Sequence, residues 1–256
     1  MKNYRKLLAG SLALFLAVRI TGCSNTSGGG TGVANEDGLV VLNVASTNQP
    51  VSFDPADANL VVNEYTEYDC YDTLLDFNQD GTDVVPALAE SWEQVDDLTY
   101  TYKIREGVKF SDGSDLTMDD VLYSLNRVRE DAYGMSYLFE HVDSFEVDEK
   151  TRTLTVHLTQ PDSTWKYVPA TTPCQILKKS VVEAEGDAYG TNEGSVVGTG
   201  PYKFVSWAAD SQIVLEKNEY WWGGADNLAI DKINFYVMKD ASTIALAVKS
   251  GTIDFA

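Results

Sequence analysis

The chain has 256 residues, of which 44% are hydrophobic and 23% are charged, a composition typical of a folded protein with one large or two modest domains. Its formal net charge is -20, which excludes nucleic acid as an expected partner because phosphate binding requires clustered Lys and Arg. We attribute most of this acidity to a solubilising surface.

The N-terminal residues have the pattern of an export signal. Three basic residues precede the apolar stretch 7–18, which is too short to span a bilayer comfortably. The run Ile-Thr-Gly-Cys that ends at Cys23 fits the lipobox of bacterial lipoproteins. It predicts that residues 1–22 are a signal peptide removed by cleavage, and that Cys23 becomes a lipidated N-terminus. An ordinary secretory signal with a coincidental cysteine is the alternative, and the charge of Arg19 so close to the cleavage point departs from the usual pattern.

A tether and the first folded elements follow the signal. Residues 23–38 join the lipidated cysteine to a Gly/Ser-rich stretch with almost nothing apolar, so we expect a flexible tether. The apolar run 39–45 predicts a buried strand, and residues 63–75 predict a helix.

Residues 87–128 predict a compact unit of strand, turns and helix. Large side chains at alternate positions of 99–104 indicate a half-buried strand, and two Gly-containing turns follow it. Thr117 and Asp120 have the spacing of a capping box, and the apolar residues after them fall on one helical face. The unit therefore ends in an amphipathic helix.

Period-two and helical patterns continue through the C-terminal half. They predict a hairpin over 145–158, a short helix over 180–185, two strands joined at Ala209-Asp210, a strand over 233–237 and a helix over 242–248. Cys70 and Cys174 are expected to be buried free thiols, since Cys is also a small core residue, although an exported protein could pair them.

One segment resembles the start of a calcium-binding loop. Asp76, Asn78, Asp80 and Gly81 have EF-hand-like spacing, but the twelfth position, which should supply a bidentate Glu, is Ala87. We therefore predict a turn and no metal site.

Other motifs with chemical meaning are incomplete. The Gly198-Thr199-Gly200 run lacks the third Gly and the helix of a dinucleotide loop, so we expect a tight turn at a cleft or hinge-side corner. The neighbouring carboxylates at 96–97 and 119–120 are better explained by turn formation and the helix dipole. His141 and His157 are far apart, and no nucleophile motif occurs. These observations predict a protein that is not an enzyme and needs no cofactor.

Two ordered sets of residues are more specific than any short motif. The first comprises Pro86, Leu88, Ala89, Ser91, Trp92, Thr99, Tyr100, Thr101, Arg105, Gly107, Val108, Lys109, Phe110, Asp112, Gly113, Leu116, Thr117, Asp120, Val121 and Ser124. The second comprises Gly198, Thr199, Gly200, Pro201, Tyr202, Trp207, Ile213, Leu215, Asn218 and Trp222. In order and spacing, both sets resemble the family 5 extracellular solute-binding proteins, the peptide-binding components of ABC importers. Phe53-Asp54-Pro55 and the last residues, 246–256, are also similar to family patterns.

The resemblance implies an α/β fold, the two-lobed architecture of type II periplasmic-binding proteins with mixed sheets and flanking helices. Residues 39–256 match the first, N-terminal lobe, and the second lobe is absent from the matched region. The matches span about the N-terminal half of a family protein, so we interpret the sequence as a fragment of a longer chain, with a natural truncation as the alternative.

The resemblance also implies a function and a site. It implies a lipid-anchored, monomeric protein on the extracellular face or periplasmic side of the cell membrane, which delivers short peptides to ABC permease subunits. Oligosaccharides and nickel complexes are the alternative ligands within the family. The loop after the first strand, the segment after Phe53-Asp54-Pro55 and an aromatic after the helix are implied to contact the ligand. These residues are Ser46, Thr47, Asn48, Asn59, Leu60, Val61, and Tyr133 or Tyr137.

Overall fold

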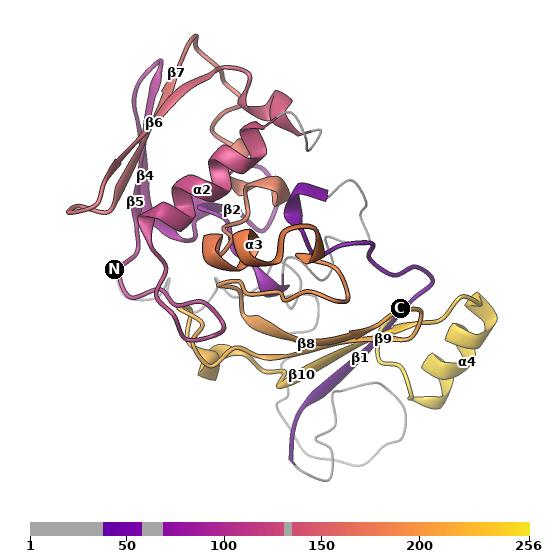
Figure 1. Cartoon of the computed structure of the whole chain (residues 1–256). Coiled ribbons are helices and arrows are strands. Elements are labelled where there is room, and N and C mark those ends of the chain that lie inside the picture. The colour runs from indigo at the N-terminus through magenta and orange to yellow at the C-terminus, as the bar shows by residue number, and fades with distance from the viewer. Residues whose placement is uncertain (1–37, 58–68, 131–134) are drawn as a thin grey trace.

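The computed structural model describes residues 38–57, 69–130 and 135–256 (Figure 1). The predicted signal peptide, Cys23 and nearly all of the tether lie outside these ranges. Within the described ranges, no helix has the length and apolar character needed to cross a bilayer.

An antiparallel four-stranded sheet forms one half of the molecule, in the order β4-β5-β7-β6. Its strands are β4 (Ala89–Asp96), β5 (Thr99–Ile104), β6 (Val142–Asp148) and β7 (Thr153–Leu158). Alternate residues of β5 and β7 are buried, which confirms the strand predicted over 99–104 and the hairpin predicted over 145–158. One face of this sheet therefore supplies a continuous apolar surface.

Helix α2 (Met118–Arg129) packs on that apolar surface (Figure 1). The predicted capping box is present, because the Thr117 hydroxyl accepts from the Asp120 amide at 3.1 Å and the Asp120 carboxylate accepts from the Thr117 amide at 3.0 Å. Val121, Leu125 and Val128 lie on the buried face of the helix. With the sheet, they form the larger apolar core, which also holds Trp165.

A mixed four-stranded sheet forms the other half, in the order β1-β10-β9-β8 (Figure 1). Its strands are β1 (Val41–Ser46), β8 (Tyr202–Ala208), β9 (Gln212–Lys217) and β10 (Lys232–Val237). β1 runs parallel to β10, whereas β10-β9 and β9-β8 are antiparallel. A second, smaller core packs on this sheet, where Phe53 meets Phe204 and Trp207 edge-on at ring-centroid distances of 5.2 and 5.7 Å.

Shorter elements complete the described chain. They are the two-stranded β2 (Leu75–Phe77) with β3 (Val84–Pro86), α3 (Lys179–Glu185), α4 (Ala241–Ser250) and several single turns of 3-10 helix. The helices predicted over 180–185 and 242–248 and the strands predicted in 39–45, 197–217 and 233–237 are present to within a few residues. Cys70 and Cys174 are both buried and unpaired with each other, which confirms the free-thiol prediction.

Residues 63–68 of the helix predicted over 63–75 lie outside the described residues, Asp69 and Cys70 are helical, and the prediction is wrong at its C-terminal end. Residues 71–74 are not helical, and Leu75 already begins β2. The carbonyl groups of this segment bond to other parts of the chain: the Asp72 carbonyl accepts from Ile176 at 2.9 Å and the Leu74 carbonyl accepts from Ala89 at 2.9 Å. Its apolar residues serve both cores, since Tyr71 belongs to the smaller core and Leu74 to the larger. Residues 71–74, the crossing segment between the two cores, are therefore not helical, because contacts with distant parts of the chain override the local helical pattern.

Gly198 and Gly200 form a tight bend against this crossing segment. A Cβ at Gly198 would lie 2.1 Å from the Cys70 carbonyl oxygen, and one at Gly200 would lie 2.5 Å from the Cys70 carbonyl carbon. The Gly200 amide donates to the Cys70 carbonyl at 3.0 Å. Close backbone approach, and not phosphate binding, therefore accounts for the two glycines.

Candidate functional site

The candidate ligand loop, defined as residues 46–48, follows β1 at the carboxyl end of a parallel strand pair. Ser46 pairs with Val237, the last residue of β10, and the Ser46 carbonyl accepts from Met238 at 2.9 Å. The Asn48 amide donates to the Ser46 hydroxyl oxygen at 3.2 Å, while Thr47 and Asn48 are exposed. Open α/β sheets bind ligands at such carboxyl ends. The geometry therefore presents two hydroxyls and a carboxamide at a suitable edge.

A tightly held turn lies just beyond this loop. It contains Phe53, which is fully buried, and η2 (Pro55–Asp57). The Phe53 amide donates to the Gly190 carbonyl at 2.7 Å, and Gly190 has a φ of 73°. A Cβ at Gly190 would lie 2.5 Å from the Asp54 backbone nitrogen, so this position requires glycine.

Asp54 in that turn forms a buried ion pair with Arg127 of α2. The two guanidinium nitrogens lie 2.6 and 2.5 Å from the two carboxylate oxygens. Asp54 was predicted from the sequence only as part of a family-like pattern, and Arg127 was not predicted at all. The two residues are 73 positions apart, and no spacing within a single sequence signals their pairing.

The other predicted site residues are placed differently. Tyr137 lies in η4 (Ser136–Phe139) with 62% of its surface exposed, in the region of α2 and β6, whereas Ser46 ends β1 in the other sheet. Asn59, Leu60, Val61 and Tyr133 lie outside the described residues.

Two acids with raised pKa values, buried Asp69 and half-buried Asp72, lie just before and in the crossing segment. Burial raises the pKa of Asp69 to about 7. Burial also raises the pKa of Asp72 to about 7, despite a hydrogen bond of 2.9 Å from the Trp222 indole nitrogen. The Arg105 guanidinium stacks 4.5 Å from the centroid of the Trp222 ring. The Asp72–Trp222 hydrogen bond joins the crossing segment to the loop after β9.

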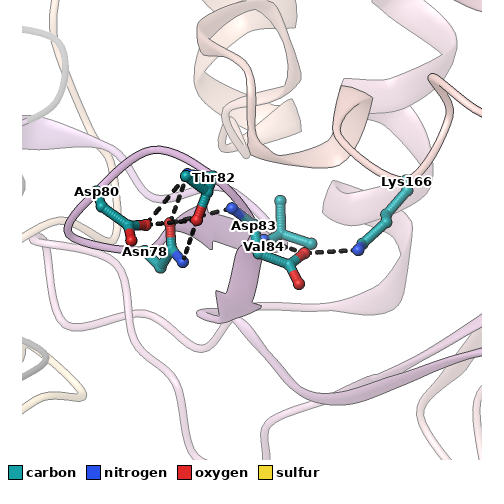
Figure 2. Close-up of polar contacts among 6 residues, drawn as sticks. All are labelled: Asn78, Asp80, Thr82, Asp83, Val84 and Lys166. Atoms are coloured by element: carbon teal, nitrogen blue, oxygen red, sulfur yellow. Dashed lines mark hydrogen bonds and ion pairs between the residues drawn. The ribbon is translucent and has the colours of Figure 1, made fainter.

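The calcium-like loop is a self-contained turn, as predicted (Figure 2). Its side-chain oxygens already accept hydrogen bonds, because the Asn78 carboxamide oxygen accepts from the amides of Thr82 and Asp83 at 2.9 and 3.1 Å. Asp80 accepts from the Thr82 hydroxyl at 2.6 Å, and Asp83 pairs with Lys166 at 2.6 Å. Across the part of the chain that the structure describes, no three His, Cys, Asp or Glu side chains gather where they could hold a metal ion.

The neighbouring carboxylates also have the predicted roles. Asp96 accepts from the Leu98 amide at 2.8 Å in the turn between β4 and β5. Asp120 closes the capping box, and Asp119 pairs with Lys179 at 2.9 Å.

Comparisons with known proteins agree with one another. Residues 83–256 match the family model of the bacterial extracellular solute-binding proteins, family 5 middle region. The chain is similar to the dipeptide-binding protein DppE of Bacillus subtilis (strain 168), with 29% identity over 277 residues that cover 100% of this chain and 50% of the relative.

Solved structures have the same fold. The periplasmic binding protein DppA from Helicobacter pylori, in complex with the peptide STSA, is 29% identical with a TM-score of 0.72 over 83% of this chain and 45% of its own. The oligopeptide-binding protein AppA from Bacillus subtilis, in complex with a nonapeptide, is 26% identical with a TM-score of 0.74, over 83% and 43%. The predicted fold class, that of type II periplasmic-binding proteins, is confirmed. The chain spans about half the length of the relatives it matches.

Proposed function

Because this chain belongs to the family 5 bacterial extracellular solute-binding proteins, we propose that it takes part in capturing short peptides for an ABC importer. The observation that carries the proposal is its similarity, along the whole chain, to a relative named for dipeptide binding. A structural neighbour that holds the peptide STSA supports the same class of ligand. Members of this family are binding proteins and not enzymes, so the chemistry required is reversible recognition.

The candidate ligand loop suits the backbone of an extended peptide. Peptide N–H and C=O groups need acceptors and donors, and the hydroxyls of Ser46 and Thr47 and the carboxamide of Asn48 supply both. Waters in the site can then accommodate varied side chains. Tyr137 and, outside the described residues, Asn59, Leu60, Val61 and Tyr133 are the further proposed contacts.

In the proposed mechanism, residues 39–256 form one lobe and a second lobe closes with it on the ligand. Hinge closure around a bound ligand is a common way for two-lobed proteins to switch state. The closed form would then be recognised by the membrane permease, with the binding protein acting as a monomer. A single lobe presents half of such a cleft, so we expect residues 24–256 alone to bind peptides weakly or not at all, and to aggregate through their uncovered apolar surface.

The membrane attachment is a separate proposal that rests on the N-terminal pattern. Residues 1–22 act as a lipoprotein signal, Cys23 carries the lipid, and residues 23–38 form the tether on the extracellular or periplasmic side. Metabolic labelling with a fatty acid tests it. Label on the wild type and none on Cys23→Ala is expected, and a wild type without label refutes the lipid anchor.

A ligand screen tests the binding function. The complete protein, as its gene encodes it, is titrated calorimetrically with dipeptides, longer peptides, oligosaccharides and nickel complexes. We expect heat release with peptides and a weaker response for Asn48→Ala, with Asn192→Ala, an Asn outside the candidate ligand loop, as the matched control. Binding of oligosaccharides or nickel complexes without peptides would favour one of the two alternative ligand classes and refute the peptide proposal.

A further inference from the structure

The Asp54–Arg127 pair is built to hold one geometry. Only 11% of the Arg127 side chain and 8% of the Asp54 side chain are exposed. Each guanidinium nitrogen faces its own carboxylate oxygen, at 2.6 and 2.5 Å. Bidentate pairs of this kind fix orientation as well as distance, because two parallel hydrogen bonds must be satisfied together.

The pair joins the turn to both cores of the molecule. Asp54 also accepts from the Ala56 amide at 3.0 Å, and its own amide donates to the Ser52 hydroxyl oxygen at 2.9 Å, so the carboxylate organises the whole turn. Phe53 inserts into the smaller core, whereas Arg127 belongs to α2, which packs on the larger core. The turn is therefore anchored from two sides.

The candidate ligand loop lies between this anchor and β1. On one side, Ser46 is held by the Met238 amide. Directly after the loop, the Gln49 side-chain oxygen accepts from the Asp210 amide at 2.6 Å. On the other side lies the turn of Ser52 to Asp54, which the pair holds. A segment tied at both ends samples fewer conformations than one tied at a single end, which lowers the entropy lost when a ligand is bound.

We propose that Arg127 is a positioning residue for ligand binding: by clamping Asp54, it fixes the far end of the loop that carries Ser46, Thr47 and Asn48. The inference rests on the proposed peptide-binding function of that loop. Arg127 itself touches no ligand in this proposal and acts through Asp54. Its contribution is therefore to the conformation of the loop and not to the contacts that the ligand makes.

A positioning role of Arg127 in ligand binding can be distinguished from a contribution to folding stability by the choice of variant. Replacing a buried ion pair by neutral side chains of similar size is often neutral for stability, whereas removing one partner leaves an unpaired buried charge and destabilises strongly. The informative variant is therefore the double change Asp54→Asn with Arg127→Met. It removes both charges, and the Asn oxygen can still accept from the Ala56 amide. Arg129→Met is the matched control, because Arg129 lies in the same turn of α2 but donates to the carbonyls of Val142 and Asp143.

Calorimetric titration with the best peptide and hydrogen exchange on the complete protein test the proposal. The double variant should bind with a Kd raised about tenfold or more at unchanged stoichiometry, and with faster exchange confined to residues 46–57. Arg129→Met should match the wild type in both measurements. Arg127→Lys, which loses the bidentate geometry, should have a Kd and an exchange rate between those of the wild type and the double variant. A double variant with wild-type Kd and wild-type exchange overturns the proposal, as does an equal loss in Arg129→Met.

Failure of the proposed function can be told apart from failure of the clamp. If the wild type binds no peptide, the peptide function fails, and the exchange measurement alone decides the anchoring role. Faster exchange at 46–57 in the double variant then still supports a clamp on this loop, and unchanged exchange refutes it. If the wild type binds and the double variant binds equally well, the function stands and the positioning role is wrong.

Discussion

The two four-stranded sheets of this protein are specified in different ways. The β4-β5-β7-β6 sheet consists of two hairpins, all of its strands lie within 89–158, and its buried face belongs to the larger apolar core. The β1-β10-β9-β8 sheet joins β1 to a strand that begins at Lys232 and rests on a smaller core. The first sheet depends on local patterning and apolar volume, whereas the second depends on contacts between distant parts of the chain.

Polar side chains form a ladder across the second sheet. Gln212 donates to the Asn234 carboxamide oxygen at 3.0 Å, and Asn234 donates to the Asn43 carboxamide oxygen at 3.0 Å. The Asn43 side-chain amide nitrogen in turn donates to the Asp254 carboxylate at 3.3 Å. A slip of one residue would turn these amides to the other face, so the ladder specifies the register of β9, β10 and β1. In the first sheet, the alternation of buried apolar residues in β5 and β7 specifies the register.

The largest effect should follow damage to the apolar core of the first sheet. Trp165 is almost completely buried, and its indole nitrogen donates to the Tyr102 hydroxyl at 3.1 Å. Trp165→Ala should lower the free energy of unfolding by about 3–5 kcal/mol, because it leaves a large cavity and an unpaired hydroxyl. Urea unfolding measures the loss. Trp207→Ala, at a half-buried position beside the second core, should cost clearly less, and an equal cost would break the contrast between the two cores.

Asp69, which lies two residues before the crossing segment 71–74, should make stability depend on pH. The folded pKa of Asp69 is raised to about 7 by burial, above its unfolded value, so the folded state binds the extra proton. Stability should therefore fall as pH rises from about 4 to 8, by on the order of 3 kcal/mol. Asp69→Asn should flatten this dependence in urea unfolding at pH 5 and pH 8. Asp72 has the same direction of shift, so part of the slope should remain.

Breaking the amide ladder should cost an intermediate amount. Asn234 is 7% exposed, and Asn234→Leu removes the acceptor for the Gln212 side-chain amide nitrogen and the donor to the Asn43 carboxamide oxygen. We expect a loss of about 1–3 kcal/mol in the free energy of unfolding. Gln212→Leu removes only the half-buried end of the ladder and is the control that should cost less. If Asn234→Leu were neutral, the second sheet would be held by its apolar contacts alone, like the first.

The smallest effect should come from the capping box of α2. Thr117→Ala removes the hydroxyl that accepts from the Asp120 amide and should cost about 1 kcal/mol. Thermal unfolding should report a fall in Tm of a few degrees. Thr243→Ala is a control in α4, since Asp240 and not Thr243 is the capping residue there. A larger cost than that of Asn234→Leu would reverse the order proposed for local and distant interactions.

The first sheet could be predicted from the sequence more completely than the second. The alternation of Tyr100 and Tyr102 and the pairing of Thr117 with Asp120 are local signals, and both were confirmed. The non-helical conformation of residues 71–74 was missed, because its cause lies in hydrogen bonds to Ile176 and Ala89 and not in its own composition. The amide ladder was missed for a similar reason, since Asn43 and Asn234 are 191 positions apart.

The candidate site shows the same limit. Ser46, Thr47 and Asn48 were singled out by family resemblance, and their composition alone, common to many polar loops, indicates no ligand. The Asp54–Arg127 pair that anchors their loop has no signature in either local sequence, because a bidentate pair forms only after the turn and α2 are packed together. Which residues bind a ligand therefore stays a prediction, whereas the scaffold that presents Ser46, Thr47 and Asn48 is described residue by residue.

The parallel pairing of β1 with β10 has a consequence for synthesis of the chain on the ribosome. β1 is among the first folded segments to emerge, but its partners are β10 and residues 254–255, which bond to Asn43 and Ala45. At typical elongation rates, the 191 residues between Asn43 and Asn234 take roughly 10–40 seconds to make. Throughout that time an apolar strand lacks both neighbours, while the β4-β5-β7-β6 sheet can already be complete. The first strand of the described residues is therefore among the last to be paired, which makes it a segment for chaperones to protect.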